Sequence, residues 1–435
     1  MKPPELKKLG FWQVVAVGLG NIVGAGIFVM AGSAINAAGP GALIAFVITS
    51  TLAVTVGLNS SELSSRFPGV EGGVYSFAKE TLGETVGFLV GWFRLISYAV
   101  SGAAVALGFS GYLTGSVLGK ELYYPLAALL IIVLSCVEAR GLRVAARAEQ
   151  GLVVFNLFGL LLFVAGVLLY SRPTGATFVP LLPHGGGGLL LAANIAFFAY
   201  SGFNTIATLT PDVERGETVV PRAIVFSLAA STLFYLVVVA TMLVPVPWNS
   251  YGTASNPLAI ALAASHAPGA VLTLVNLSAL TATFTVTLSL IIAGSRTTKQ
   301  MAADGMLPGL LGHGSWVPTA VVATIMVASL GLGNVETIAL VANFGVIFSY
   351  MLSGVEVAVA RKRKVAGKFS SPGFPYVQAI SVGLSVLMLV SLGARSLEFA
   401  TLTLVLGLLA HLMHREFGGQ KRRGEGKAGP DAASI

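Results

Sequence analysis

Four glycines lie close together in the middle of an apolar run from Phe11 to Ala38 that carries no charged residue. Such a run is long enough to cross the roughly 30 Å hydrocarbon core of a membrane. Each glycine weakens a helix relative to alanine and lets the backbone come close to a ligand. An unwound backbone at that depth must be buried in protein or line a wet cavity. The cluster therefore indicates a binding site or, alternatively, a close helix–helix contact between small residues; it comprises Gly18, Gly20, Gly24 and Gly26.

A second apolar run, at about residues 189–210, is interrupted in a similar manner. Its centre, residues 197–204, reads FFAYSGFN and mixes a glycine with polar residues at mid-membrane depth. This run is the sixth along the chain, five after the glycine-rich one, so two repeats of five spans would have opposite orientations in the membrane. Paired interrupted spans in corresponding positions of two halves indicate a transporter site at the interface of inverted repeats.

The two interruptions would release backbone groups that suit an amino acid. A half-helix that starts near Gly26 presents free N–H groups and the positive end of its dipole, which stabilise a carboxylate. We assign this role to the N–H groups around Gly24, Ala25 and Gly26. An unwound segment also frees carbonyl oxygens, which suit an ammonium that is otherwise costly to bury. Backbone sites of this kind recognise the part that all α-amino acids share.

The composition is that of a multi-pass membrane protein. Of the 435 residues, 55% are hydrophobic and 10% are charged, against about 25% charged residues in soluble domains. The mean hydropathy is +0.84. The single cysteine, Cys136, excludes an intramolecular disulfide, and its place in a predicted span favours a small core residue.

Twelve apolar runs predict twelve transmembrane helices in the plasma membrane, with both termini in the cytoplasm. Of the 26 lysines and arginines, 22 fall on the cytoplasmic side of this topology and three on the other side. That asymmetry follows the positive-inside rule, so the net charge of +8 reflects topology and not nucleic-acid binding. The runs are residues 11–38, 40–61, 86–113, 122–137, 150–170, 189–210, 223–247, 267–295, 316–335, 337–357, 374–394 and 396–413.

Motifs between about residues 10 and 375 resemble, in order, those of the amino acid–polyamine–organocation superfamily of permeases. Each motif alone is weak, but the ordered set is specific. GAGIF at residues 24–28 is similar to the first-helix motif, and FAYSGF at residues 198–203 is similar to the sixth-helix break. The others are ELSSRFP at 62–68, GGVY at 72–75, Gly83, GW at 91–92, PRAI at 221–224, SR at 295–296 and MAADGMLP at 301–308.

The resemblance implies an all-α membrane protein with twelve transmembrane helices. Ten would form a five-plus-five inverted-repeat core with broken helices 1 and 6, and two would be peripheral. The transmembrane transporter domain is expected at residues 1–417, followed by a disordered, polar cytoplasmic tail at 418–435. Pro211 departs from the family pattern and predicts an early end to the inner half of the sixth helix. The expected parts of the domain are a first repeat at about 11–170, a second at about 189–368 and peripheral helices at 374–413.

The resemblance also implies which residues surround the substrate. Phe198, Tyr200 and Phe203 are candidate pocket walls or gates, unless they are ordinary packing residues. A lysine- or polyamine-type substrate needs an acidic partner, yet no carboxylate lies at mid-depth in the spans that would form the side-chain pocket, and Glu356 lies near the inner end of the tenth. A neutral amino acid is therefore favoured. The carbonyls expected to bind the ammonium belong to Ile22, Phe198, Ala199 and Ser201.

Coupling centres on Asn156, which matches a position in the fifth helix that is a lysine in several proton-coupled members of the superfamily. The resemblance places it beside the carbonyls of Gly20 and Val23. An asparagine does not exchange a proton near neutral pH, so the match excludes a lysine-based proton switch. With Thr281 and Thr285, which share a helical face, Asn156 could hold a sodium ion. Alternatively, it forms only an interhelical hydrogen bond while the threonines bond their own helix.

Arg94 is the only lysine or arginine inside a predicted span, and charges at membrane depth are functional candidates by default. It lies about two turns into the third span, from where its side chain can reach the inner interface. We expect an ion pair, structural or at an inner gate, with Glu62, Glu138 or Asp212 as its partner, in preference to substrate contact.

No catalytic constellation, metal-ligand spacing or nucleotide-binding motif is present, so we expect no enzyme activity, metal or cofactor. We predict a secondary active transporter of amino acids, favouring neutral ones, that works by alternating access. Alternatives are a polyamine or cationic amino acid carrier, an amino acid exchanger and, in another class, an amino-acid-sensing membrane protein that does not transport. The expected partners are an amino acid, the lipid bilayer, and a coupling ion (proton or sodium) or counter-substrate. The side-chain preference, the form of coupling and the oligomeric state stay open.

Overall fold

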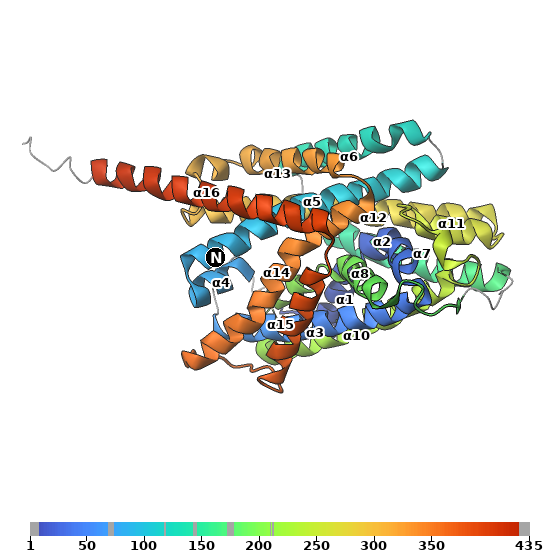
Figure 1. Ribbon diagram of the computed structural model, residues 1–435, viewed down its shortest axis with the longest axis horizontal. Coiled ribbons are helices and arrows are strands. Elements are labelled where there is room, and N and C mark those ends of the chain that lie inside the picture. Colours follow the sequence, from blue (N-terminus) through green and yellow to red (C-terminus); the bar gives the residue numbers. More distant parts are fainter. Residues whose placement is uncertain are drawn as a thin grey trace, which may run out of the picture.

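The computed structural model describes residues 8–67, 74–116, 119–141, 146–171, 178–208, 210 and 213–425. This part of the chain is almost entirely helical and forms a bundle from which the last helix extends at one end (Figure 1). Helices form along the predicted apolar runs because a helix satisfies its own backbone hydrogen bonds where no water is available.

Within the described residues, six helical stretches are long and apolar enough to cross a membrane. A seventh results if α15 and the start of α16, bent by 107° at their junction, count as one span. Length and hydropathy alone therefore do not reproduce the twelve predicted spans, since several of them are split or short. The long helices are α3 (Ala42–Arg66), α5 (Glu84–Ser116), α7 (Ala146–Tyr170), α10 (Gly216–Met242), α12 (Gly269–Ala303) and α14 (Val335–Lys362).

Shorter helices occupy the other predicted spans and two connections. α16 continues to Glu425, into the segment predicted to be a disordered tail, and residues 426–435 lie outside the described chain. Pro211 also lies outside it, so the predicted effect of this proline on the sixth span is not visible. The shorter helices are α4 (Val74–Leu82), α6 (Tyr123–Ala139), α11 (Pro257–Ala264), α13 (Trp316–Ser329), η8 (Leu330–Leu332) and α15 (Tyr376–Val390). The last predicted span begins the 32-residue α16 (Ala394–Glu425).

The first and sixth predicted spans are both interrupted, as their glycine and polar residues predicted. The first consists of α1 (Phe11–Ile22) and α2 (Ala25–Ala38), separated by two residues. The sixth consists of α8 (Gly185–Phe197) and the single 3₁₀ turn η4 (Phe198–Tyr200), followed after a turn by the short α9 (Asn204–Thr208).

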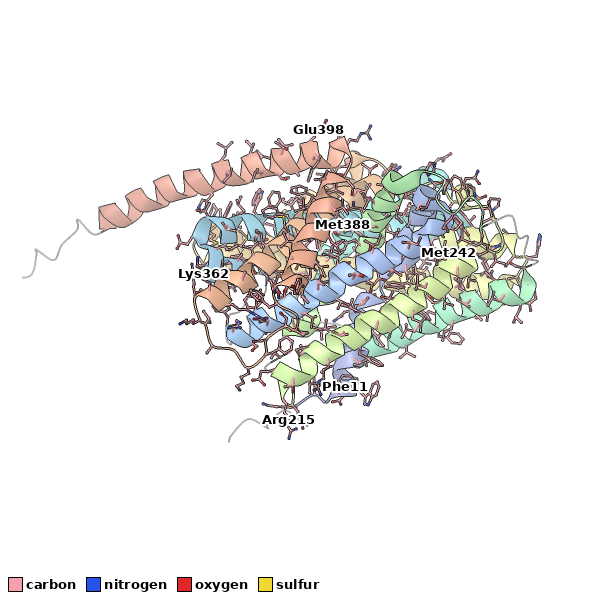
Figure 2. All side chains as sticks on the ribbon, turned by 60° about the horizontal axis from the view of Figure 1, so that its bottom comes forward. Phe11, Arg215, Met242, Lys362, Met388 and Glu398 are labelled. Atoms are coloured by element: carbon pink, nitrogen blue, oxygen red, sulfur yellow. The ribbon has the colours of Figure 1, made fainter. Side chains whose placement is uncertain are left out.

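Of the interrupted helices, α2 and the second half of α8 are buried inside the bundle, whereas α1 is partly exposed. α2 packs against α8 and η4, and α1 packs against α9 and α10. Figure 2 shows Phe11, at the start of α1, beside the Arg215 end of α10, where its ring contacts Phe226 edge-on at 6.0 Å between centroids. α3 lies against both α8 and α10, and α5 lies against α12 and α14. The long helices thereby hold the two breaks from several sides.

Candidate functional site

The break in the first span leaves a half-helix with an open N-terminus. Val23 ends α1 with its N–H donating to Leu19 O at 2.7 Å, and the Gly24 N–H donates to Ile22 O at 2.8 Å. Gly24 caps α2 in an extended conformation, with φ −112° and ψ −150°, and supplies no side-chain cap. The first N–H groups of α2, from Ala25 onward, are therefore the open donors that an anion could accept. The structure thus leaves Ala25 and Gly26 available for the predicted carboxylate role, while the Gly24 N–H is engaged locally.

The break in the sixth span contains one position whose backbone conformation requires glycine. After η4, Gly202 takes φ +112°, a left-handed conformation that other residues rarely adopt. Before it, Ser201 turns back on η4, and both its N–H (3.4 Å) and its hydroxyl (2.8 Å) donate to Phe198 O. The carbonyl of Phe198, one of those predicted to bind the ammonium, thus already accepts two local hydrogen bonds.

The two breaks touch each other through glycines. A Cβ added to Gly26 would lie 2.4 Å from Ala199 Cα and 3.0 Å from Phe198 O, so the backbones of α2 and η4 are in direct contact. A Cβ on Gly202 would lie 2.4 Å from the carbonyl oxygen of Asn21. These glycines are required because two backbones approach more closely than any side chain permits. The predicted substrate residues of both spans are thereby brought together.

Tyr235 of α10 joins the two breaks and was not predicted from the sequence. Its hydroxyl lies 2.8 Å from Ile22 O and 2.9 Å from Ala199 O, and the side chain is fully buried. Two of the four carbonyls predicted to bind the ammonium are therefore hydrogen-bonded to one phenol. Each carbonyl oxygen has a second lone pair, so an ammonium can still bind beside the phenol. The sequence signal that could have identified Tyr235 is a tyrosine in the middle of an apolar helix, because a buried tyrosine hydroxyl needs a hydrogen-bond partner.

Among the described residues, those next to the breaks are exposed on one side and buried on the other. Residues 22–35 and 192–200, which lead away from the breaks along α2 and α8, are all buried. In the other direction Ser201 is exposed, and Asn21, Gly202 and Asn204 are partly exposed. Access to the released backbone groups therefore runs past α1 and α9.

The predicted coupling residues are partly brought together. Asn156 is buried, and its side-chain oxygen accepts a hydrogen bond from the Thr281 hydroxyl at 2.8 Å. The Thr285 hydroxyl instead donates to its own helix, at 3.0 Å from the Thr281 and Ala282 carbonyls. Gly20 faces the same helix as Asn156, since a Cβ there would lie 3.0 Å from Val153 of α7.

The predicted walls or gates are packed rather than open. The Tyr200 hydroxyl lies 3.2 Å from Phe46 O and 3.1 Å from the Thr232 hydroxyl, which ties η4 to α3 and α10. The ring of Phe203 lies 5.4 Å from that of Tyr350 on α14. Both side chains are fully buried in this conformation.

The partner predicted for Arg94 differs from the one found. Arg94 donates to the Tyr98 hydroxyl at 2.7 Å and lies over the rings of Tyr98 and Tyr350. Of its three candidate partners, Glu62 was wrong, because Arg361 of α14 binds that carboxylate through two bonds of 2.7 Å and Arg66 binds it at 2.8 Å. Glu138 makes no ion pair within 4.0 Å among the described residues, and Asp212 lies outside them.

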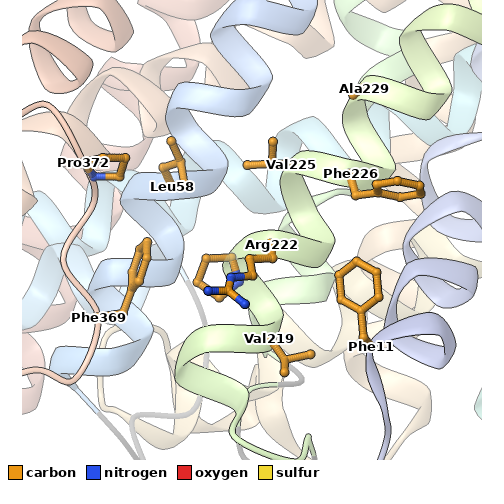
Figure 3. Close-up of a pocket in the computed structure, with 10 residues that line it drawn as sticks. Phe11, Leu58, Val219, Arg222, Val225, Phe226, Ala229, Phe369 and Pro372 are labelled. Carbon is orange, nitrogen blue, oxygen red and sulfur yellow. The ribbon is translucent and has the colours of Figure 1, made fainter.

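A groove of about 740 Å³ opens between α3 and α10, away from the breaks (Figure 3). Leu58 and Val225 line it, and the guanidinium of Arg222 is its polar group. The groove contains none of the predicted substrate residues and opens outward, so it is not the candidate substrate site.

A bundle of apolar helices in which two interrupted helices face each other with open backbone ends defines a membrane protein of the transporter class. The chain matches the family model described as amino acid permease over residues 9–396. It therefore belongs to the amino acid permease family, within the superfamily that its motifs resemble, and is a multi-pass membrane protein.

Similar proteins bear names that cover several substrates. The branched-chain amino acid permease BcaP of Bacillus subtilis is 26% identical and the methylthioribose transporter of the same organism is 28% identical, each over 94% of this chain and 93% of the relative. The cationic amino acid transporter 3, mitochondrial, of Arabidopsis thaliana is 26% identical over 82% of this chain and 62% of the relative. The family and these relatives are transporters, which supports an amino acid as the class of substrate.

Proposed function

We propose that the protein is a secondary active transporter that moves neutral amino acids across the plasma membrane by alternating access. The observation that carries this proposal is the contact between the two breaks, where Gly26 meets Ala199 and Gly202 meets Asn21. An amino acid bound there would engage both interrupted helices at once. Its carboxylate would accept from the N–H groups at the start of α2, and its ammonium would donate to the carbonyls of Ile22 and Ala199.

The exposed residues around the breaks support a conformation that is open to one side. With both termini in the cytoplasm, as the distribution of lysine and arginine predicts, the accessible side next to α1 and α9 faces the cytoplasm. Transport would then require α1 and α9 to close and the buried region around α2 and α8 to open. We infer that this change of conformation takes place between two inverted five-helix repeats, each of which begins with one of the interrupted helices.

The side-chain preference follows from the absence of acidic residues next to the breaks. The sequences of α2, α8 and η4 contain no aspartate or glutamate. A cationic side chain entering this region would lack a counterion, so a neutral amino acid is favoured over the substrate named for the cationic transporter of Arabidopsis thaliana. Methylthioribose, named for another relative, has neither a carboxylate nor an ammonium and would leave both sets of backbone groups without charged partners.

Uptake into proteoliposomes tests the proposal. Purified protein is reconstituted and supplied with labelled L-leucine, L-arginine, putrescine or methylthioribose under a proton gradient, a sodium gradient, internal unlabelled amino acid, or no gradient. We expect L-leucine to enter and L-arginine, putrescine and methylthioribose to be poor substrates. Uptake of L-arginine, putrescine or methylthioribose in preference to L-leucine would overturn the proposed substrate class. Binding without uptake under any condition would instead indicate the sensor alternative.

A further inference from the structure

Glu356, in the last third of α14, is a buried carboxylate that none of the interactions above employs. The side chain has no solvent exposure, and neither carboxylate oxygen has a hydrogen-bond partner. Within the described chain, no lysine, arginine or histidine nitrogen lies within 4.0 Å of it. By contrast Glu62, which is equally buried, binds two guanidinium groups and Ser371.

The surroundings of Glu356 are apolar. Leu352, one helical turn earlier on the same face, packs against the cluster that includes Tyr75 of α4 and Phe88 of α5. Val357, the next residue, packs with Leu63 and Phe77. Glu356 therefore projects into the contact between α14, α4 and α5, which Figure 1 shows side by side at one end of the bundle.

The charged groups on the neighbouring helices are engaged elsewhere or face water. From α4, Tyr75 and Lys79 both contact Asp304, and from α5 Arg94 contacts Tyr98. Other titratable groups on the helices around α14 include the Glu62–Arg66–Arg361 cluster of α3 and α14, the buried Tyr112 of α5, and Glu336 near the start of α14. His411 of α16 stacks its ring on Phe88 at 4.4 Å. The exposed groups are Glu80, Glu84, Lys362, Tyr376, Arg395 and Glu398.

An ionised carboxylate in this position would have neither water nor a counterion, which is a very costly arrangement at membrane depth. The side chain must therefore be the neutral acid in the conformation described. Ionisation requires that the contact between α14, α4 and α5 open to admit water or a cation. Protonation of Glu356 is thereby tied to the arrangement of these three helices.

The same helix reaches the candidate substrate site. Tyr350 lies six residues before Glu356, or about 9 Å along the helix axis. Its ring lies 5.7 Å from Phe197 and 5.4 Å from Phe203, the residues on either side of the second break. A displacement of α14 that exposes Glu356 would consequently also move the wall of the break.

On the basis of the transport function proposed above, we propose that Glu356 is the carboxyl group that binds the coupling proton. Because Glu356 lies near the inner end of α14, proton loading requires that water from the external side reach it along α14 in the opposite conformation. The carboxylate then takes one proton from that water, forming the O–H bond of a neutral acid. When α14 separates from α4 and α5, that bond breaks and the proton passes to cytoplasmic water, leaving the carboxylate. No other reactant is needed, and one proton would cross with each amino acid.

The test compares wild-type protein with Glu356→Gln, which has the shape of the neutral acid, and with Glu217→Gln as a control. Glu217 is a surface residue that pairs with Lys368 at 2.9 Å. Proteoliposomes with an acidic exterior are given labelled L-leucine, and pyranine inside reports proton entry. For one proton per substrate, the gradient supports at most about tenfold accumulation for each pH unit.

We expect wild type and the control to accumulate L-leucine with internal acidification. Glu356→Gln should lose both the accumulation of L-leucine and the internal acidification. Its counterflow of labelled against unlabelled L-leucine should stay within about twofold of wild type, because exchange needs no net proton transfer. If the Gln variant is unstable, Glu356→Asp should shift the pH of half-maximal uptake. The inference would be overturned if Glu356→Gln accumulated L-leucine under the pH gradient as wild type does. It would also be overturned if wild-type uptake were the same with and without the pH gradient. Absence of any wild-type uptake or counterflow would instead count against the transport function itself.

Discussion

The contact between Gly26 and η4 makes a sharp prediction for Gly26→Ala. The new Cβ would lie 2.4 Å from Ala199 Cα and 2.9 Å from Ala199 N, both of which are backbone atoms that cannot rotate away. Unbonded carbons meet at about 3.5–4.0 Å, so α2 and η4 must separate by about 1 Å or more. Overpacking of this kind costs about 1–3 kcal/mol.

That separation moves the N–H groups of α2 away from the carbonyls of η4. Most of the overpacking free energy should therefore appear as weaker substrate binding. We therefore expect Gly26→Ala to weaken L-leucine binding by about 5- to 150-fold, the equivalent of 1–3 kcal/mol. The assay is equilibrium binding of labelled L-leucine to purified protein, with size-exclusion chromatography to confirm folding.

Gly383→Ala is the matched control, because Gly383 lies within α15 and a Cβ there would meet nothing within 4 Å. It should bind L-leucine as wild type does and gain a little helix stability. A folded Gly26→Ala protein whose affinity stays within about twofold of the control would refute the reasoning, because overpacking of this contact should cost more.

Three further substitutions address other parts of the site. Tyr235→Phe removes the hydroxyl shared by Ile22 O and Ala199 O, so the substrate-free protein should lose about 1–3 kcal/mol of stability. Saturating L-leucine should then raise the melting temperature more than in wild type, because the ammonium satisfies both carbonyls. Asn156→Lys places an ammonium beside Thr281 and should change the pH dependence of uptake relative to wild type. Glu62→Gln breaks a buried ion cluster and should lower stability by about 3–5 kcal/mol, seen as a lower melting temperature in detergent.

Each of these expectations has a contradicting result. An equal ligand-induced shift in Tyr235→Phe and wild type would mean that the ammonium does not use the bridged carbonyls. Identical pH profiles for Asn156→Lys and wild type would remove Asn156 from the coupling site. For Glu62, the control is Glu217→Gln, whose partner Lys368 has 78% of its side chain exposed. A loss of stability no larger than in that control would contradict a structural role for the buried cluster.

The positions of the breaks were predictable because their causes are local. A cluster of glycines within an apolar run marked the end of α1 at Ile22 and the start of α2 at Ala25. A serine and a glycine in FFAYSGFN marked the turn that follows η4, and Gly202 takes the left-handed conformation that this turn needs. The family followed from short motifs in a fixed order, and the family model covers the same region.

The partners of individual side chains were not predictable because they depend on residues far away in the sequence. Tyr235 bonds a carbonyl 213 residues earlier in the chain, and nothing around it in α10 indicates that contact. Glu62 was one of three carboxylates considered as the partner of Arg94, but it is bound by Arg361, 299 residues away, because α14 and the segment containing Ser371 converge on the end of α3. The sequence identified Glu356 as an acid near a helix end, and only packing shows that it has no partner.

The proposed function requires that backbone groups of the two interrupted helices bind both charges of one small molecule. The most direct measurement is the affinity of the purified protein for L-leucine, L-leucinamide and 4-methylpentanoate by competition against labelled L-leucine. The amide lacks the carboxylate that α2 should bind, and the acid lacks the ammonium that Ile22 and Ala199 should bind. We predict that only L-leucine competes strongly and that each analogue is at least about tenfold weaker, since each loses one charged interaction. Competition by either analogue at the level of L-leucine would contradict the central claim.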